Sequence, residues 1–171
     1  MTSVQPLSSE HPNRPDIGVC VLGNVNQGKV GIDQLPHITN LLVRAQSHIM
    51  TRQVHPTSQA NAYVDTYHDI GLGLSNHAFW LANQGLRYGQ QEALDKHDQW
   101  MEHVSFNCHV ASVDLASELG AAKGFEYHDK LLPINRYNRN VDKLVNRAYD
   151  CDWAQLNLRI QQHGMYNVGL M

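Results

Sequence analysis

Three cysteines are the side chains of this sequence best suited to redox or nucleophilic chemistry. Cys20, Cys108 and Cys151 lie far apart, without a Cys-x-x-Cys pair. This spacing predicts neither a disulfide framework nor a thiolate zinc site, so we expect reduced thiols. For each of them, the alternative interpretation is a small buried hydrophobic side chain. Cys20 is distinguished by its surroundings, the run Ile17-Gly18-Val19-Cys20-Val21-Leu22-Gly23-Asn24-Val25-Asn26-Gln27-Gly28-Lys29-Val30.

Glycines after this cysteine have the spacing of a phosphate-binding loop. Gly23-x-x-x-x-Gly28-Lys29 is the spacing with which a P-loop cradles phosphates by its backbone N–H groups. Val30, however, stands where that motif needs a Ser or Thr hydroxyl to hold Mg²⁺. The Asn-Lys-x-Asp motif that recognises guanine does not follow. Turn-forming glycines explain the spacing, so nucleotide hydrolysis is not predicted.

Histidines and carboxylates raise the question of a metal site. His97, His103 and His109 are six residues apart, a spacing that rotates side chains by about 240° on a helix, so they cannot converge. Asp98 and Glu102 share a helix face but lack the Asp/Glu-x-x-His partners of a di-iron site. We predict no metal.

Two other motifs are incomplete. Gly71-x-Gly73 lacks the third glycine and the acidic residue of a dinucleotide site. Ser75 follows Gly73 without the second glycine of a Gly-x-Ser-x-Gly elbow. We expect no cofactor to be bound by this chain.

Length and composition predict one ordinary domain. The chain has 171 residues, 42% of them apolar, and a formal net charge of −3. We expect an extended lead-in at 1–16 and a single domain over 17–171. The 13 basic and 16 acidic residues form no long cationic run, which disfavours nucleic-acid binding. No apolar stretch approaches the ~20 residues of a membrane span, and the polar start does not resemble a signal peptide, so we expect a cytosolic protein.

Apolar periodicity predicts an α/β pattern in which helix outweighs strand. Strands are expected at 17–22, 70–74 and 165–171, and an extended segment at 131–134. Helices are expected at 33–53, 75–83, 90–119, 140–148 and 152–164, and a loop at 56–61. In the first helix the expected buried stripe is Leu35, Ile38, Leu42, Ala45 and Ile49, and in the longest helix it is Leu94, Met101, Val104, Cys108, Ala111, Leu115 and Leu119.

Several segments, taken in order, resemble consecutive stretches of the large, catalytic chain of class I ribonucleotide reductases. They span nearly the entire chain with almost no gaps. These segments are Pro6-Leu7, the Cys20 run with Asn26, the helix from Asp33, Gly71-Leu72-Gly73, Phe79-Trp80-Leu81-Ala82, Gly85-Leu86-Arg87-Tyr88, Ala111-Ser112-x-Asp114-Leu115-Ala116, Gly120, Leu132-Pro133-Ile134-x-x-Tyr137, Asp152-Trp153 and His163-Gly164-x-x-Asn167.

The resemblance implies both a fold and a chemistry. Members of that family fold around a ten-stranded α/β barrel and reduce ribonucleotides to deoxyribonucleotides by a thiyl-radical route, with a radical-generating small subunit. By resemblance, Cys20 matches one of the two cysteines that supply reducing electrons and end each turnover as a disulfide, and Asn26 is placed close to the substrate. The expected fold is a partial barrel of this type, helix-dominated and with few short strands.

The resemblance also implies that working parts of the site lie outside this sequence. The family's radical cysteine would precede Met1 and its phosphate-binding loop would follow Met171. Within the matched region, Tyr67-His68 replaces a basic pair and Tyr166 replaces an arginine. These departures suggest relaxed catalytic demands.

Two hypotheses about function follow. In the first, complementary large-subunit fragments and the small subunit reassemble with this chain, which supplies Cys20 and part of the barrel wall. In the second, the chain is a non-catalytic, repurposed homologue that acts as a helical binding or scaffold protein. We expect it to be inactive alone, and self-association is a further possibility for its assembly.

Overall fold

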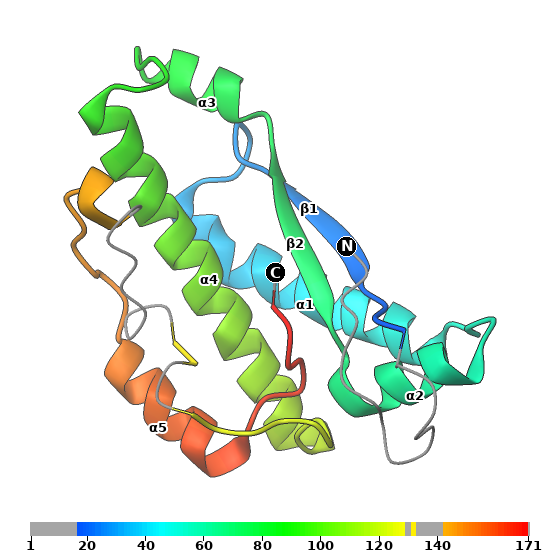
Figure 1. Ribbon diagram of the computed structural model, residues 1–171. Coiled ribbons are helices and arrows are strands. Elements are labelled where there is room, and N and C mark those ends of the chain that lie inside the picture. Colours follow the sequence, from blue (N-terminus) through cyan, green and yellow to red (C-terminus); the bar gives the residue numbers. More distant parts are fainter. Residues whose placement is uncertain (1–16, 129–130, 133–141, 171) are drawn as a thin grey trace.

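The computed structural model describes residues 17–128, 131–132 and 142–170. Helices cover one face of a short parallel sheet (Figure 1). The elements are β1 (Val21–Asn26), the 3₁₀ turn η1 (Ile32–Gln34), α1 (Leu35–Arg52), α2 (Ser58–Tyr67), β2 (Ile70–Ser75), α3 (His77–Asn83), α4 (Gln91–Leu119), the 3₁₀ turn η3 (Asp142–Leu144) and α5 (Trp153–His163).

The sheet pairs β1 with β2 in parallel, with Val21 opposite Ile70. A parallel pair needs a crossover connection, which α1 and α2 provide here. Leu170 forms a further parallel bridge to Ile70, so the chain near its C-terminus lies beside β2 (Figure 1). In β1 the inward Val25 is 2% exposed and the outward Leu22 is 76% exposed. One face of β1 therefore packs on helices, and its other face is open in the part of the chain described.

Two apolar clusters hold the elements together. The first joins the sheet to α1 and α4 through buried side chains that include Val43, Ile70 and Trp100. The second packs α5 on α4, with Trp153 and Ile160 at its centre. Because α4 contributes to both clusters, this 29-residue helix is the element that connects the sheet to the C-terminal region.

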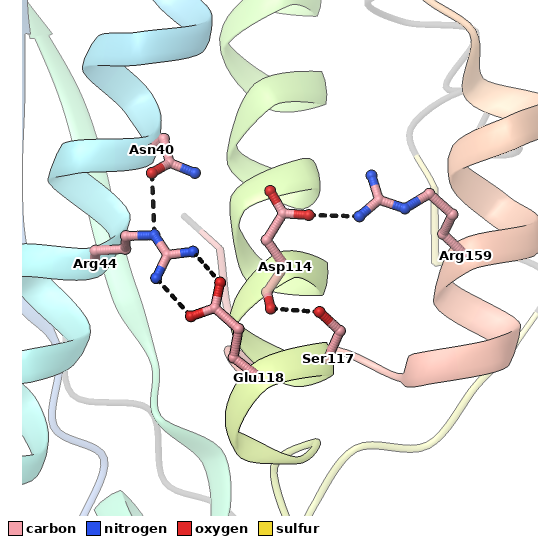
Figure 2. A network of polar contacts seen from close by, with 6 residues as sticks. All are labelled: Asn40, Arg44, Asp114, Ser117, Glu118 and Arg159. Atoms are coloured by element: carbon pink, nitrogen blue, oxygen red, sulfur yellow. Dashed lines mark hydrogen bonds and ion pairs between the residues drawn. The ribbon is translucent and has the colours of Figure 1, made fainter.

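Ion pairs on the surface of α4 bind it to its two neighbours (Figure 2). Arg44 of α1 donates two hydrogen bonds to Glu118, at 2.9 and 2.6 Å, and one to Asn40. On the α5 side, Arg159 pairs with Asp114. Hydrogen bonding from Arg44 lowers the pKa of Glu118.

Replacing Arg44 by methionine is expected to lower the melting temperature by only about 1–2 °C at neutral pH. The pair is exposed to solvent, which screens its charges, and ordering two long side chains costs entropy. Since the folded-state pKa of Glu118 is depressed, the contribution is present above the unfolded pKa and is lost as the pH falls through the lower, folded-state value. Thermal melts at neutral and acidic pH measure this. A fall in melting temperature that is equally large at neutral and acidic pH would contradict this prediction.

Most of the expected elements are confirmed. The structure contains the helices expected at 33–53, 75–83, 90–119 and 152–164, with boundaries shifted by a few residues, and the strand expected at 70–74. Asp152 caps α5 by accepting a hydrogen bond from the N–H of Gln155. Gly85 and Gly120 follow their helices with positive φ, as expected for helix-ending glycines. None of the described helices combines the length and apolar character needed to cross a membrane.

Four predictions of secondary structure need correction. The strand expected at 17–22 is instead Val21–Asn26, because pairing with β2 starts at Val21. The loop expected at 56–61 contains the start of α2, which Thr57 caps through the N–H of Ala60. In the described part of 140–148 only the turn η3 forms. Within 165–170 only Leu170 pairs with the sheet. Residues 133–134, 140–141 and 171 of the expected elements, and the lead-in 1–16, lie outside the described residues.

The predicted buried stripe of α1 is rotated in the structure. Ile49 is 51% exposed, whereas Thr39, Gln46 and Ser47 are buried. Gln46 is buried because its Nε2 donates to the sheet carbonyls of Val21 and Gly71. In α4 the predicted stripe is buried at its centre, but its end residue Leu119 is 66% exposed.

Candidate functional site

Cys20 lies one residue before β1, at the N-terminal end of the strand. Its thiol is free and partly buried, and its Sγ lies 3.7 Å from the carbonyl oxygen of Val21. The other two cysteines belong to different parts of the fold: Cys108 is buried in α4, and Cys151 precedes α5. The three cysteines therefore belong to separate parts of the fold.

Burial and charge both disfavour the thiolate form of Cys20. Desolvation raises the pKa of its thiol, and the negative charge of Asp69 raises it further. The thiolate is the nucleophilic form of cysteine. Cys20 is therefore not activated as a nucleophile, because both effects make its thiol harder to deprotonate.

Asn26 ends β1 at the opposite end from Cys20. Its backbone carbonyl accepts hydrogen bonds from the N–H groups of Lys29 and Val30, and its side-chain Oδ1 accepts one from Asn76, at 3.1 Å. Asn26 follows Cys20 by six residue steps of extended chain, a distance of roughly 20 Å. The structure therefore places the two predicted site residues along one strand without bringing them together.

The turn after β1 explains why the P-loop spacing occurs without a P-loop. A Cβ atom on Gly28 would lie 2.6 Å from Nδ2 of Asn76 and 2.7 Å from Cδ1 of Phe79. Glycine is thus required by the close approach of α3. Lys29 is exposed at this turn.

A second thiol has a histidine neighbour but not the properties of a nucleophile. Sγ of Cys151 lies 3.6 Å from Nδ1 of His103. Burial, followed by the charges of Glu102 and Asp150, raises the pKa of Cys151 to about 12. Burial alone raises the pKa of Cys108 to about 12. Neither thiol is activated, because thiolate is scarce at neutral pH in both.

Sequence reasoning missed two polar groups near the ends of the strands. Asp69, 8% exposed, precedes β2 and contributes to the electrostatics of Cys20. Gln27, 1% exposed, lies at the other end and contacts His77, whose ring lies 4.4 Å from that of His97. A charged residue directly before an apolar strand was the available signal for Asp69.

The fold and this strand define an α/β protein with a protonated cysteine at one end of a parallel sheet. A family model described as the ribonucleotide reductase barrel domain matches residues 5–171. The chain belongs to this family, as the resemblance implied.

The chain is also similar to proteins named as alpha subunits of ribonucleoside-diphosphate reductase. The chain is 30% identical over 165 residues to the ribonucleoside-diphosphate reductase subunit alpha of Buchnera aphidicola, covering 94% of this chain and 22% of that protein. It is 30% identical to the Haemophilus influenzae subunit alpha, covering 95% of this chain and 22% of that protein. For the subunit alpha of Enterobacteria phage T4 the identity is 28%, covering 91% and 21%. The chain thus spans about a fifth of the length of these curated relatives.

Proposed function

We propose that this chain forms part of the barrel wall of a ribonucleotide reductase large subunit and contributes Cys20 to the reduction of ribonucleotides. The observation that carries the proposal is the placement of Cys20 at the head of β1, in a parallel sheet within the matched barrel domain.

The proposed activity requires other parts of a large subunit. Among the described residues β1 pairs only with β2, and Leu22 on its open face is 76% exposed. An unpaired strand edge favours association with further protein. We propose that complementary large-subunit segments complete the barrel, that a radical-generating small subunit acts with them, and that this chain is inactive alone.

Reconstitution tests the proposal. The chain is combined with the remaining segments of the Haemophilus influenzae subunit alpha and with a radical-generating small subunit, and deoxyribonucleoside diphosphate is measured. Product is expected only when the chain is present together with the other components. The matched control replaces this chain by the corresponding segment of the Haemophilus protein, which shows that the mixture can assemble.

A negative result has a clear meaning. If the control mixture turns over and the mixture with this chain does not, the catalytic proposal is overturned. A chain that is then monodisperse and melts cooperatively by itself would favour the non-catalytic scaffold alternative.

A further inference from the structure

A buried carboxylate lies at the same end of the sheet as Cys20. Asp69 directly precedes β2 and is 8% exposed. Its Oδ2 accepts a hydrogen bond from the hydroxyl of Tyr63 in α2, and its Oδ1 accepts one, at 2.7 Å, from the N–H of Gly169. Contacts from two other segments of the chain thus fix both carboxylate oxygens.

The register of the sheet places Asp69 and Cys20 at the same end of two neighbouring strands. Val21 pairs with Ile70, so the residues that precede this pair are Cys20 on one strand and Asp69 on the other. Neighbouring strands lie about 4.8 Å apart.

The C-terminal segment is shaped to fit this carboxylate. A Cβ atom on Gly169 would lie only 2.6 Å from Oδ1 of Asp69, too close for any other residue without movement. The carbonyl of Gly169 also accepts a hydrogen bond from the N–H of Ile70. The segment that lies beside β2 is therefore the one that holds Asp69 in place.

We propose that Asp69 acts on Cys20 as a positioning residue: its fixed negative charge, on the neighbouring strand, disfavours the thiolate form of the reduced cysteine. This inference rests on the proposed function, since it assigns a purpose to the protonated state of the proposed reductant. The direction of the electrostatic effect agrees, because the charge of Asp69 raises the pKa of the Cys20 thiol, after the larger effect of burial. The other titratable groups at Asp69 are Tyr63, its hydrogen-bond donor, and His68, whose Nδ1 lies 3.0 Å from the carbonyl of Tyr166.

The test is the pH–rate profile for alkylation of Cys20, followed in the intact chain by mass spectrometry of the peptide that contains it. Asp69→Asn removes the charge and keeps an oxygen that can accept from Gly169. The midpoint of the profile of this variant is expected to move to lower pH. A fall of about one pH unit means about tenfold faster alkylation at any pH well below the midpoint. An unchanged midpoint in a variant that still melts cooperatively would overturn the proposal.

Two matched variants separate charge from structure. Asp65→Asn removes an exposed carboxylate of α2 and should leave the profile unchanged. Tyr63→Phe breaks a hydrogen bond of Asp69 but keeps its charge, so it should not move the midpoint to lower pH. If Tyr63→Phe lowered the midpoint as much as Asp69→Asn does, the cause would be a loosened structure that exposes Cys20. That result would overturn the proposed role of the Asp69 charge. None of these readouts requires turnover, so this inference and the proposed function can fail separately.

Discussion

Cys20→Ser is expected to abolish deoxyribonucleotide formation in the reconstituted complex while leaving the fold intact. Serine is nearly isosteric, and Cys20 is only partly buried, so little packing is lost. A hydroxyl cannot supply the two-electron, disulfide-forming chemistry proposed for the thiol. Product formation under multiple turnover, with circular dichroism to check folding, measures the effect.

Cys151→Ser provides the matched control for this substitution. Cys151 is also a free and partly buried thiol, but it precedes α5 and is far in the sequence from β1. Turnover in this variant should stay close to that of the unaltered chain. Unchanged turnover in Cys20→Ser would reject the redox role of Cys20, whatever the control shows.

The elements predicted best are those whose ends are marked by local chemistry. Asp152 at the start of α5 and Gly120 at the end of α4 act through their own neighbours in the chain, so the sequence contains their signal. The helix α2 has a similar signal in Thr57, but it stands in a segment of small polar residues that also favours a loop.

The strand β1 differs from its predicted bounds because its pattern mixes two environments. The apolar run 17–22 suggests a strand buried on both faces, whereas the observed strand is buried on one face and carries exposed Asn24 and Asn26 on the other. Where a strand begins depends on its pairing partner, and that partner, β2, lies about fifty residues away. Only the long-range register determines such a boundary.

The sequence also did not reveal which polar side chains are buried. Gln46 is buried by its bonds to carbonyls of both strands, and Asp69 by bonds to α2 and to Gly169, one hundred residues later in the chain. A buried polar group is stable only where it has hydrogen-bond partners, and the tertiary fold supplies those partners. The role of Cys20 came from family resemblance, and the carboxylate beside it came from the structure.

Glu102→Gln is expected to destabilise the fold by about 2–4 kcal/mol, among the largest effects of a single conservative change in this chain. Glu102 lies in α4 and is 8% exposed. Its carboxylate accepts hydrogen bonds from the N–H groups of Asp150 and Cys151, both at 3.1 Å, and from the indole of Trp153 at 2.9 Å. This single side chain therefore accepts the hydrogen bonds of the backbone N–H groups that lead into α5.

An amide replaces this carboxylate only in part. Glutamine retains one acceptor oxygen, but its NH₂ group would turn donors toward the N–H of Asp150, which the second carboxylate oxygen also accepts. The charge is also lost near the N-terminus of α5, where the helix dipole favours a negative group. The second apolar cluster, centred on Trp153 and Ile160, depends on this anchor for the position of α5.

Thermal melting and tryptophan fluorescence measure the effect. For a chain of this length, the expected loss corresponds to a fall in melting temperature of about 4–16 °C. Glu92→Gln is the matched control, because Glu92 lies on the same helix in an exposed pair with Lys96, and its melting temperature should change by no more than about 1 °C. If Glu102→Gln melted as late as this control, the carboxylate would not be the anchor of α5, and the attachment of the C-terminal helix would have to come from apolar packing alone.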